Sequence, residues 1–173
     1  MLVLIGESAS GKSSIEKTLV NDYGYTKLVT YTTREPRVGE VNGVDYHFVS
    51  EEKFNELANN GFFVEKAVYN GWHYGTAKED CTNDKIAVLT PHGFRQIKKF
   101  PEIKITSFYI DVPRRDRLIK ILERGDSIEE SYRRNLSDVG MFDGIADEVD
   151  YVISNPSYKK SIDDMAREIL NHY

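Results

Sequence analysis

Residues 6–13 read GESASGKS, which fits the spacing G-x-x-x-x-G-K-[ST] of a phosphate-binding glycine loop. Glycine lets the backbone wrap so that several N–H groups point at phosphate oxygens, beside the positive end of the helix that follows. In such a loop the lysine places its charge on the β- and γ-phosphates, and the serine offers its hydroxyl to Mg²⁺. The loop therefore predicts a triphosphate site made by Gly6, Ala9, Ser10, Gly11, Lys12, Ser13 and Ser14, with Ser13 as the metal ligand.

A second stretch, TYTTREPRVGEVNGVDYHFVS, begins at Thr30 and carries side chains that suit another phosphate. The glycine loop alone leaves the acceptor open, because GTPases, ATPases and small-molecule kinases share it. Arg34 and Arg37 flank Pro36, so they do not lie on one face of a continuing helix. Two guanidinium groups and the hydroxyls of Thr30 and Tyr46 can converge on one phosphate. For two spaced arginines alone, a solvated basic turn is the alternative.

With this stretch the chain resembles the guanylate kinase family, which carries S-x-T-T-R-x-x-R-x-G-E-x-x-G-x-D-Y-x-F-V-S after its glycine loop. The motif is long and tightly spaced, and the resemblance extends over the whole chain. It implies that ATP phosphorylates GMP to give GDP and ADP. The later YNGWHYGT resembles the family's segment ending Y-Y-G-[ST]. The residues implied for the GMP phosphate are Thr30, Arg34, Arg37, Tyr46 and Tyr74, and Thr76 is implied for the base.

Glu65 matches the glutamate with which this family binds guanine, and the chemistry of the base gives an independent reason for it. Guanine presents N1–H and the 2-amino group as adjacent donors, and one carboxylate accepts both. Adenine lacks the 2-amino donor and has no proton on N1. A hydroxyl such as that of Thr76 can donate to guanine O6. Because the wrong base leaves buried polar groups unpaired, these residues predict selection for guanine. Without the surrounding motif, an exposed strand glutamate is the alternative.

Residues 123–144 resemble the family's lid, which reads R-G-x-x-x-E-E-x-I-x-x-R-L. Strict spacing places Asn135 where the family has arginine, so one of the two preceding arginines is expected to contact the transferring phosphoryl group. A charged face on a surface helix is the alternative reading. The likeness of DYVISN to the family implies that Asn155 lies near the adenine of ATP. The catalytic residues implied are Lys12, Arg124, Arg133 and Arg134.

The chain departs from the family after the apolar run Ile86–Leu89. The family has D-x-D-x-x-G there and this chain has VLTPHG, so Val88 and Thr90 replace two carboxylates. P-loop enzymes normally use an acid at a strand end to help hold Mg²⁺. The Mg²⁺ that accompanies ATP is therefore expected to contact Ser13, without acids at positions 88 and 90.

Two other functions stay open at this point. One is a kinase of the same fold with another acceptor, such as dGMP, ribose 1,5-bisphosphate or another monophosphate. The other is a non-catalytic guanylate-kinase-like module that binds peptides, which the intact glycine loop disfavours. The expected partners are GMP and MgATP, with no nucleic acid and no membrane, and the protein is expected to be a monomer or a homodimer.

Short apolar runs between helical patterns indicate the elements that position these residues. Apolar residues at helical spacing follow the glycine loop, Pro91 and Pro113 and close the chain. This alternation predicts an α/β fold of the P-loop NTPase type, a parallel sheet flanked by helices. We expect a core of residues 1–30, 77–122 and 145–173, a small β-rich monophosphate-binding insertion at 31–76 and a helical lid at 123–144. The expected strands are Leu2–Ile5, Ile86–Leu89, Ile103–Ile110 and Tyr151–Ile153, and Asn42–Gly43 predicts a hairpin turn.

Composition narrows the class of protein. With 173 residues, 40% hydrophobic and 29% charged, the chain suits one globular domain. Its net charge of −5 provides no overall basic surface for nucleic acid. The apolar opening Met1–Ile5 is too short for a signal peptide or a membrane span. The single cysteine, Cys81, suits a reducing compartment, so a cytoplasmic location is expected.

Overall fold

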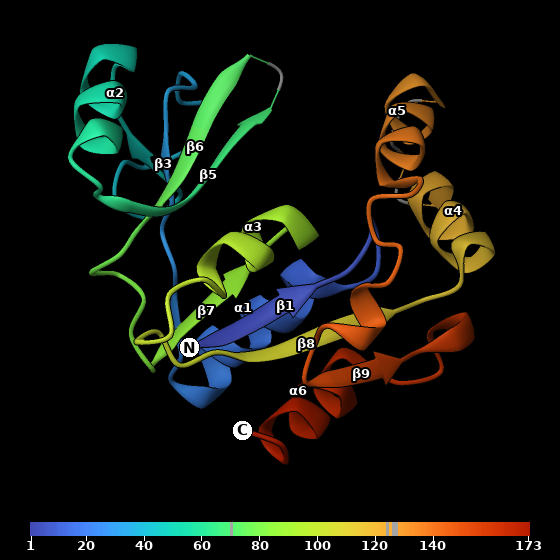
Figure 1. Ribbon diagram of the computed structural model, residues 1–173. Helices are drawn as coiled ribbons and strands as arrows, with labels where there is room; N and C mark the ends of the chain where they lie inside the picture. The colour runs from blue at the N-terminus through green and yellow to red at the C-terminus, as the bar shows by residue number, and fades with distance from the viewer. Residues whose placement is uncertain (70, 124, 126–127) are drawn as a thin grey trace.

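Two β-sheets organise the chain in the computed structural model (Figure 1). The structure describes residues 1–69, 71–123, 125 and 128–173, without the side chains of Tyr69, Glu130, Ser131 and Arg134. The first sheet is parallel and has the order β2-β7-β1-β8-β9. Its strands are β1 (Leu2–Ile5), β2 (Thr26–Lys27), β7 (Lys85–Val88), β8 (Thr106–Asp111) and β9 (Tyr151–Ser154).

Alternate residues of β1 face opposite sides of this sheet, because successive side chains of a strand point in opposite directions. Leu2 and Leu4 pack with helices α1 (Lys12–Tyr23) and α6 (Ile162–Leu170), whereas Val3 and Ile5 pack with α3 (Pro91–Ile97). Helices therefore cover both faces, and the predicted α/β fold with a flanked parallel sheet is confirmed. The strands expected at the start and end of the chain are confirmed, but β8 begins at Thr106 and not at Ile103.

The second sheet has the order β4-β3-β6-β5 and is formed by the segment that resembles a monophosphate site. Its strands are β3 (Tyr31–Thr32), β4 (His47–Phe48), β5 (Phe63–Tyr69) and β6 (Trp72–Ala77), and helix α2 (Glu51–Asn59) lies against it. Phe54 of α2 stacks on Phe63 with ring centroids 4.6 Å apart. The hairpin expected at Asn42–Gly43 is wrong, because Asn42 forms a single parallel bridge with Tyr46.

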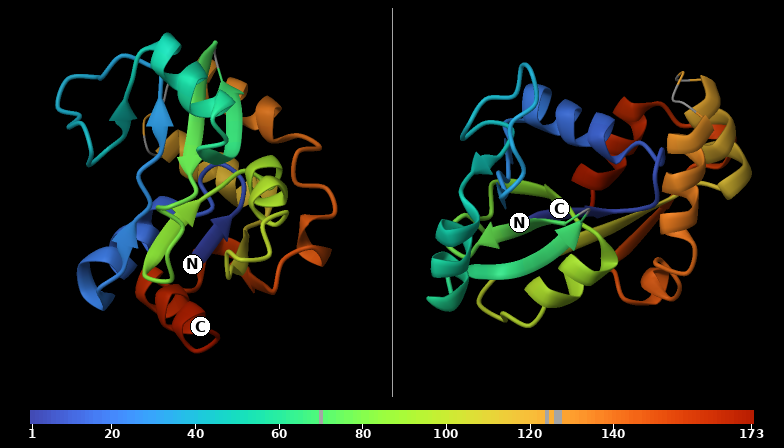
Figure 2. Two further views of the ribbon diagram at one scale, coloured as in Figure 1. Left: turned by 60° about the vertical axis from the view of Figure 1, so that its left-hand side comes forward. Right: turned by 90° about the horizontal axis from the view of Figure 1, so that it is seen from above.

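Helix α4 (Arg114–Glu123) ends where the segment that resembles a lid begins, and α5 (Ile128–Asp138) lies within that segment. They stand on one side of the core, and the second sheet stands on the other side (Figures 1 and 2). Two short 3₁₀ helices, η1 (Ile145–Asp147) and η2 (Pro156–Tyr158), flank β9. Among the helices of the described residues, none has the length and apolar character needed to cross a bilayer.

One side chain ties the second sheet to the core. The amide of Gln96, on α3, donates to the Lys66 carbonyl at 2.8 Å and accepts from the Lys66 N–H at 3.0 Å. Lys66 follows Glu65 on β5, so this pair fixes the position of Glu65 beside the N-terminal half of α3.

The N-terminus of α6 is stabilised by hydrogen bonds between two residues that cap the helix. Ser161 accepts from the Asp164 N–H at 3.1 Å and Asp164 accepts from the Ser161 N–H at 3.2 Å, so the two residues form a capping box. We expect Ser161→Ala to lower the free energy of unfolding by about 1 kcal/mol in urea titrations, because a helix donor loses its partner. Ser161→Asp retains a capping carboxylate and should stay near the parent; equal losses in both variants would contradict the capping role.

Candidate active site

The glycine loop lies between the end of β1 and the start of α1, as the sequence predicts. Gly11 has φ 100° and Ala9 has φ 64°, both in the left-handed region that turns the chain sharply before the helix. A Cβ at position 6 would lie 2.8 Å from the carbonyl oxygen of Ile110, so the loop approaches β8 too closely for any other residue. Ser10 is fully buried beneath the loop. This geometry is that of a phosphate cradle at a helix N-terminus.

Lys12 lies over the loop, with its ammonium turned back toward it. Its Nζ donates to the Glu7 carbonyl at 2.8 Å and to the Ser10 hydroxyl at 3.4 Å. Burial lowers the pKa of Lys12 to about 8, and the nearby carboxylates of Asp138 and Glu7 partly oppose that shift. A desolvated ammonium interacts more strongly with a phosphate than an exposed one does.

Helices α4 and α5 contact the same loop through residues that the sequence analysis did not identify. The carboxylate of Asp138, on α5, accepts from the Ser8 N–H at 2.8 Å. Arg117 is 5% exposed, and its guanidinium lies 3.6 Å from Asp138 and 3.4 Å from the Glu7 carboxylate. A loop N–H that could face a phosphate thus has a carboxylate partner in this structure. No local sequence pattern points to these contacts, because Glu7, Arg117 and Asp138 come from three distant segments.

The other lid predictions have mixed outcomes. Arg124 and the side chain of Arg134 lie outside the described residues, and Arg133 is exposed on α5. Asn135 is buried and accepts from Arg114 Nη2 at 2.6 Å. Asn135 therefore orients an arginine of α4, and the catalytic roles of Arg124, Arg133 and Arg134 stay predictions.

The residues expected to hold the acceptor phosphate meet in the second sheet. The guanidinium of Arg34 lies 5.3 Å from the ring centroid of Tyr46, and the ring of Tyr74 is 6.0 Å from that of Tyr46. Glu40 accepts from Arg34 Nη2 at 2.8 Å and from the Arg37 N–H at 2.7 Å. The hydrogen bond from Arg34 lowers the pKa of Glu40, so the carboxylate stays ionised and holds the arginine in place.

Glu65 and Thr76, the residues expected to read the base, form a buried pair. They are 6% and 0% exposed, and the Thr76 hydroxyl donates to Glu65 Oε2 at 3.0 Å. A Cβ at Gly93 would lie 3.1 Å from Glu65 Oε1, so the start of α3 packs against the carboxylate. Burial raises the pKa of Glu65, and the hydrogen bond from Thr76 only partly opposes this shift. A base that donates two hydrogen bonds would stabilise the ionised form.

Thr90 and Asn155 form hydrogen bonds that stabilise the local fold. The hydroxyl of Thr90 accepts from the Gly93 N–H at 3.2 Å and caps α3, where the family has the second acid of its D-x-D motif. Asn155 is 1% exposed; its amide donates to the Lys160 carbonyl at 3.1 Å and accepts from the Lys160 N–H at 2.8 Å. Its contact with adenine stays a prediction, because these bonds show only that it shapes the loop before α6.

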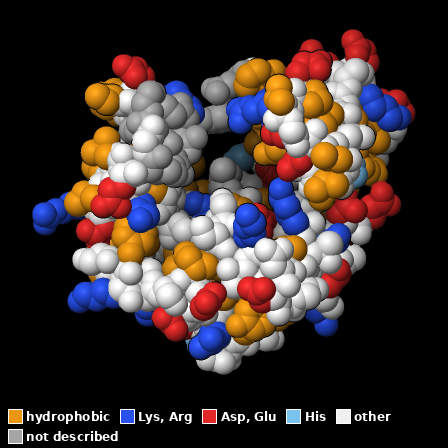
Figure 3. All heavy atoms as spheres, turned by 180° about the vertical axis from the view of Figure 1, so that it is seen from behind, with side chains coloured by type: hydrophobic (Ala, Val, Ile, Leu, Met, Phe, Trp, Pro, Cys, Tyr) orange, Lys and Arg blue, Asp and Glu red, His pale blue; other side chains and the backbone are white. Residues whose placement is uncertain are grey.

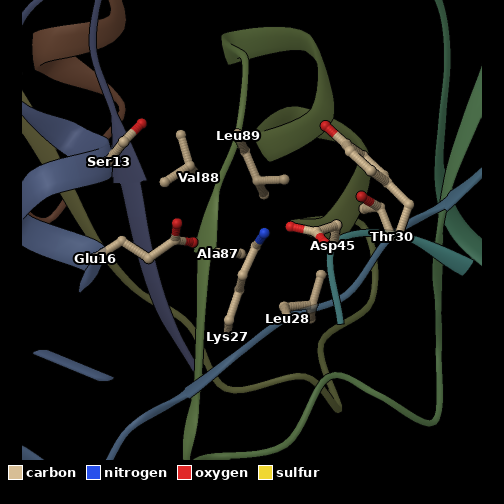
Figure 4. A pocket seen from close by; sticks show the side chains of 10 residues that line it. Ser13, Glu16, Lys27, Leu28, Thr30, Asp45, Ala87, Val88 and Leu89 are labelled. Atoms are coloured by element: carbon tan, nitrogen blue, oxygen red, sulfur yellow. The ribbon is translucent and has the colours of Figure 1, made fainter. Parts of the chain in front are cut away.

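A cavity of about 270 Å³ joins the two halves of the site (Figure 4). Ser13 enters it from the glycine loop, and Thr30 and Tyr46 enter it from the acceptor segment. Val88, at the end of β7, lines it without a charge. On a wider scale, the surface is hollowed between the lid and the second sheet, with Lys and Arg side chains around the hollow (Figure 3).

The donor set suits Mg²⁺ only together with a nucleotide. Among the described residues, no group of three or more His, Cys, Asp or Glu side chains is placed to hold a metal ion. Mg²⁺ is usually bound through one or two protein oxygens, water and substrate phosphates. The Ser13 hydroxyl at the N-terminus of α1 points into the cavity and fits that requirement (Figure 4).

The raised pKa of Glu65 predicts how stability depends on pH. A carboxyl whose pKa is raised by folding contributes stability in full below its unfolded pKa, and this contribution is lost as pH rises through the folded value. Glu65→Gln is neutral at every pH. We therefore expect its unfolding free energy relative to the parent to increase as the pH rises from about 4 to about 7 in urea titrations. The exposed Glu129→Gln controls for the loss of one negative charge; a relative stability of Glu65→Gln that falls over this range would contradict the prediction.

Comparisons with known proteins agree with the resemblance seen in the motifs. The family model described as Guanylate kinase matches residues 1–173. The guanylate kinase of Wolinella succinogenes is 38% identical over 170 residues, which cover 93% of this chain and 79% of that protein. That of Haemophilus influenzae is 36% identical over 177 residues, covering 95% and 84%. A crystal structure of guanylate kinase from Anaplasma phagocytophilum matches 99% of this chain and 82% of that chain, with a TM-score of 0.68 and 25% identity. The chain therefore belongs to the guanylate kinase family.

Proposed function

We propose that this protein transfers the γ-phosphate of ATP to GMP and releases GDP and ADP. One observation carries the proposal beyond family membership: Ser13 of the glycine loop and Thr30 and Tyr46 of the acceptor segment line one cavity. A GMP phosphate oxygen attacks the γ-phosphorus in line, and the bond from that phosphorus to the β–γ bridging oxygen breaks. The attacking phosphate is already anionic, so positioning and charge neutralisation supply most of the catalysis.

On the donor side, the glycine loop and α1 bind the triphosphate. The N-terminus of α1 and the ammonium of Lys12 favour the β- and γ-phosphates. Ser13 would hold Mg²⁺ together with the nucleotide, and the ion would supply positive charge to the phosphates. The other residues of the proposed ATP site are Gly6, Ala9, Ser10, Gly11, Ser14 and Asn155.

On the acceptor side, the second sheet binds GMP. Arg34 and Tyr46, with Arg37, Thr30 and Tyr74, hold the phosphate. Glu65 accepts from N1–H and the 2-amino group of guanine. The Thr76 hydroxyl, which donates to Glu65 in this structure, turns to donate to guanine O6 when the base is bound. These contacts are the same for GMP and dGMP, because none of them involves the ribose.

The proposed mechanism divides the chain into three parts: a core of residues 1–30, 77–122 and 145–173, an acceptor segment at 31–76 and a lid at 123–144. Closure of the acceptor segment and the lid excludes water from the transferring group and so prevents hydrolysis of ATP. Arg124, Arg133 and Arg134 then supply positive charge from the lid. The single cysteine, Cys81, is consistent with the proposed action in the cytoplasm. The protein is proposed to act as a monomer or a homodimer.

The proposal is tested by ADP release with MgATP and a panel of acceptors: GMP, dGMP, AMP, CMP, UMP and ribose 1,5-bisphosphate. We expect turnover with GMP and dGMP. Glu65→Gln should lower kcat/KM for GMP by about 10²-fold or more, because the amide cannot accept two donors without presenting its own N–H group. Absence of turnover with every acceptor would refute kinase activity, and equal turnover with AMP and GMP would refute the reading of guanine by Glu65.

The contact of Asp138 with the loop predicts a change in donor affinity. The Asp138 carboxylate accepts from Ser8 N–H and lies near Lys12 and Arg117, so its charge opposes an incoming triphosphate. We expect Asp138→Asn to lower the KM for MgATP by about fivefold, which is about 1 kcal/mol. Asp143→Asn, on the loop after α5, is the control for a carboxylate without this contact. A higher KM in Asp138→Asn would show that the carboxylate supports donor binding.

A further inference from the structure

Lys27 has no role in the mechanism above, yet it lies beside the acceptor site. It ends β2, the edge strand of the core sheet, where it pairs in register with Ile86 of β7. The next residue, Leu28, donates its N–H to the Ile86 carbonyl at 2.8 Å, and the chain then passes to β3 of the second sheet. Lys27 is therefore held by the core at the point where the backbone leaves for the acceptor segment.

The side chain of Lys27 enters the cavity that joins the donor and acceptor halves of the site. Lys27 is the one lysine or arginine among the residues that line this cavity in the described part of the chain. Its ammonium lies 5.9 Å from the ring centroid of Tyr46, a residue assigned above to the acceptor phosphate. Figure 4 shows the ammonium in the open space between Glu16 and Asp45, with Ser13 on the far side of Glu16.

Two carboxylates flank the ammonium (Figure 4). Glu16 lies one helical turn after Ser13 on α1, so both side chains face the cavity. Burial raises the pKa of Glu16, and the nearby positive charge of Lys27 opposes that shift. Asp45 is fixed by the Val41 N–H at 2.7 Å. Within the described residues, none of the close ion pairs includes Lys27, so its ammonium is not committed to one carboxylate.

We propose that Lys27 is a further catalytic residue, whose ammonium binds the acceptor phosphate of GMP and neutralises it as its oxygen approaches the donor. This inference rests on the proposed function. Without a cation here, an incoming dianion would face Glu16 and Asp45 in a partly buried space, where like charges repel strongly. The strand that in P-loop enzymes normally ends in a metal-binding acid ends in Val88 here, so the charged side chains that line this part of the cavity beside Val88 include the lysine of β2.

The test compares Lys27→Met with Lys17→Met. Methionine keeps much of the length of the side chain and removes its charge, and Lys17 is an exposed lysine on α1 that does not line the cavity. Binding of GMP and of guanosine is measured by calorimetry, and kcat/KM is measured with MgATP. We expect Lys27→Met to weaken GMP binding by about 10–100-fold and to leave guanosine binding unchanged, because only GMP carries the phosphate. Lys17→Met should match the parent in both.

Lys27→Arg separates a direct role from a structural one. If the charge acts on the phosphate, arginine should restore most of the GMP affinity and of kcat/KM. Equal loss of GMP and guanosine binding in Lys27→Met, with a lower melting temperature, would overturn the proposal in favour of a structural role, and unchanged GMP binding would overturn it outright. If the parent binds GMP but shows no turnover, the proposed kinase function fails, while the comparison of GMP with guanosine still decides whether Lys27 binds the phosphate.

Discussion

Two nucleotides that each carry several negative charges must be brought into bonding contact, and their mutual repulsion is the constraint on which this active site depends. The protein is itself acidic, with a net charge of −5, so attraction by the whole molecule cannot overcome that repulsion. The structure instead places single cations at separate points of the proposed site: Lys12 over the glycine loop, Arg34 just after β3 and Arg117 on α4. Each comes from a different element, so the full set of charges depends on the whole fold.

Arg34 and Arg117 are each held by a carboxylate and Lys27 is flanked by two, and this explains how an acidic chain can suit anionic ligands. Glu40 holds Arg34, Glu7 and Asp138 hold Arg117, and Glu16 and Asp45 flank Lys27. The carboxylates fix the geometry of the cations before a ligand arrives, which reduces the reorganisation needed when it binds. They also weaken the attraction for phosphate, so they must be close to the cation and away from the ligand. Asp138 is the exception, because its carboxylate contacts a loop N–H.

Local motifs were enough to predict the glycine loop, the acceptor segment and the pair of Glu65 and Thr76, because in each case neighbouring residues carry the chemistry. The parallel sheet followed from the alternation of short apolar runs with helical patterns. Lys27 could not be found in this way, since a strand of two residues has no periodicity and the cavity is formed by four segments that are distant in the sequence. The expected hairpin at Asn42–Gly43 failed because its flanking residues bond within a wider loop, where Asn42 Oδ1 accepts from the Phe48 N–H at 2.9 Å. Arg117 and Asp138 meet only through tertiary packing of the lid.

The hydrogen bonds between Gln96 and the backbone of Lys66 have a mechanical consequence. They link β5 to α3 of the core immediately beside Glu65. Any rotation of the second sheet relative to the core would therefore have its hinge near Lys66. In such a rotation, residues near the hinge move little and residues far from it move most. The carboxylate that reads the base would therefore stay almost still, while the loop that carries Arg34 and Tyr46 would sweep toward the glycine loop. A rotation of the second sheet about this contact would therefore bring the acceptor phosphate toward the glycine loop with little displacement of the base.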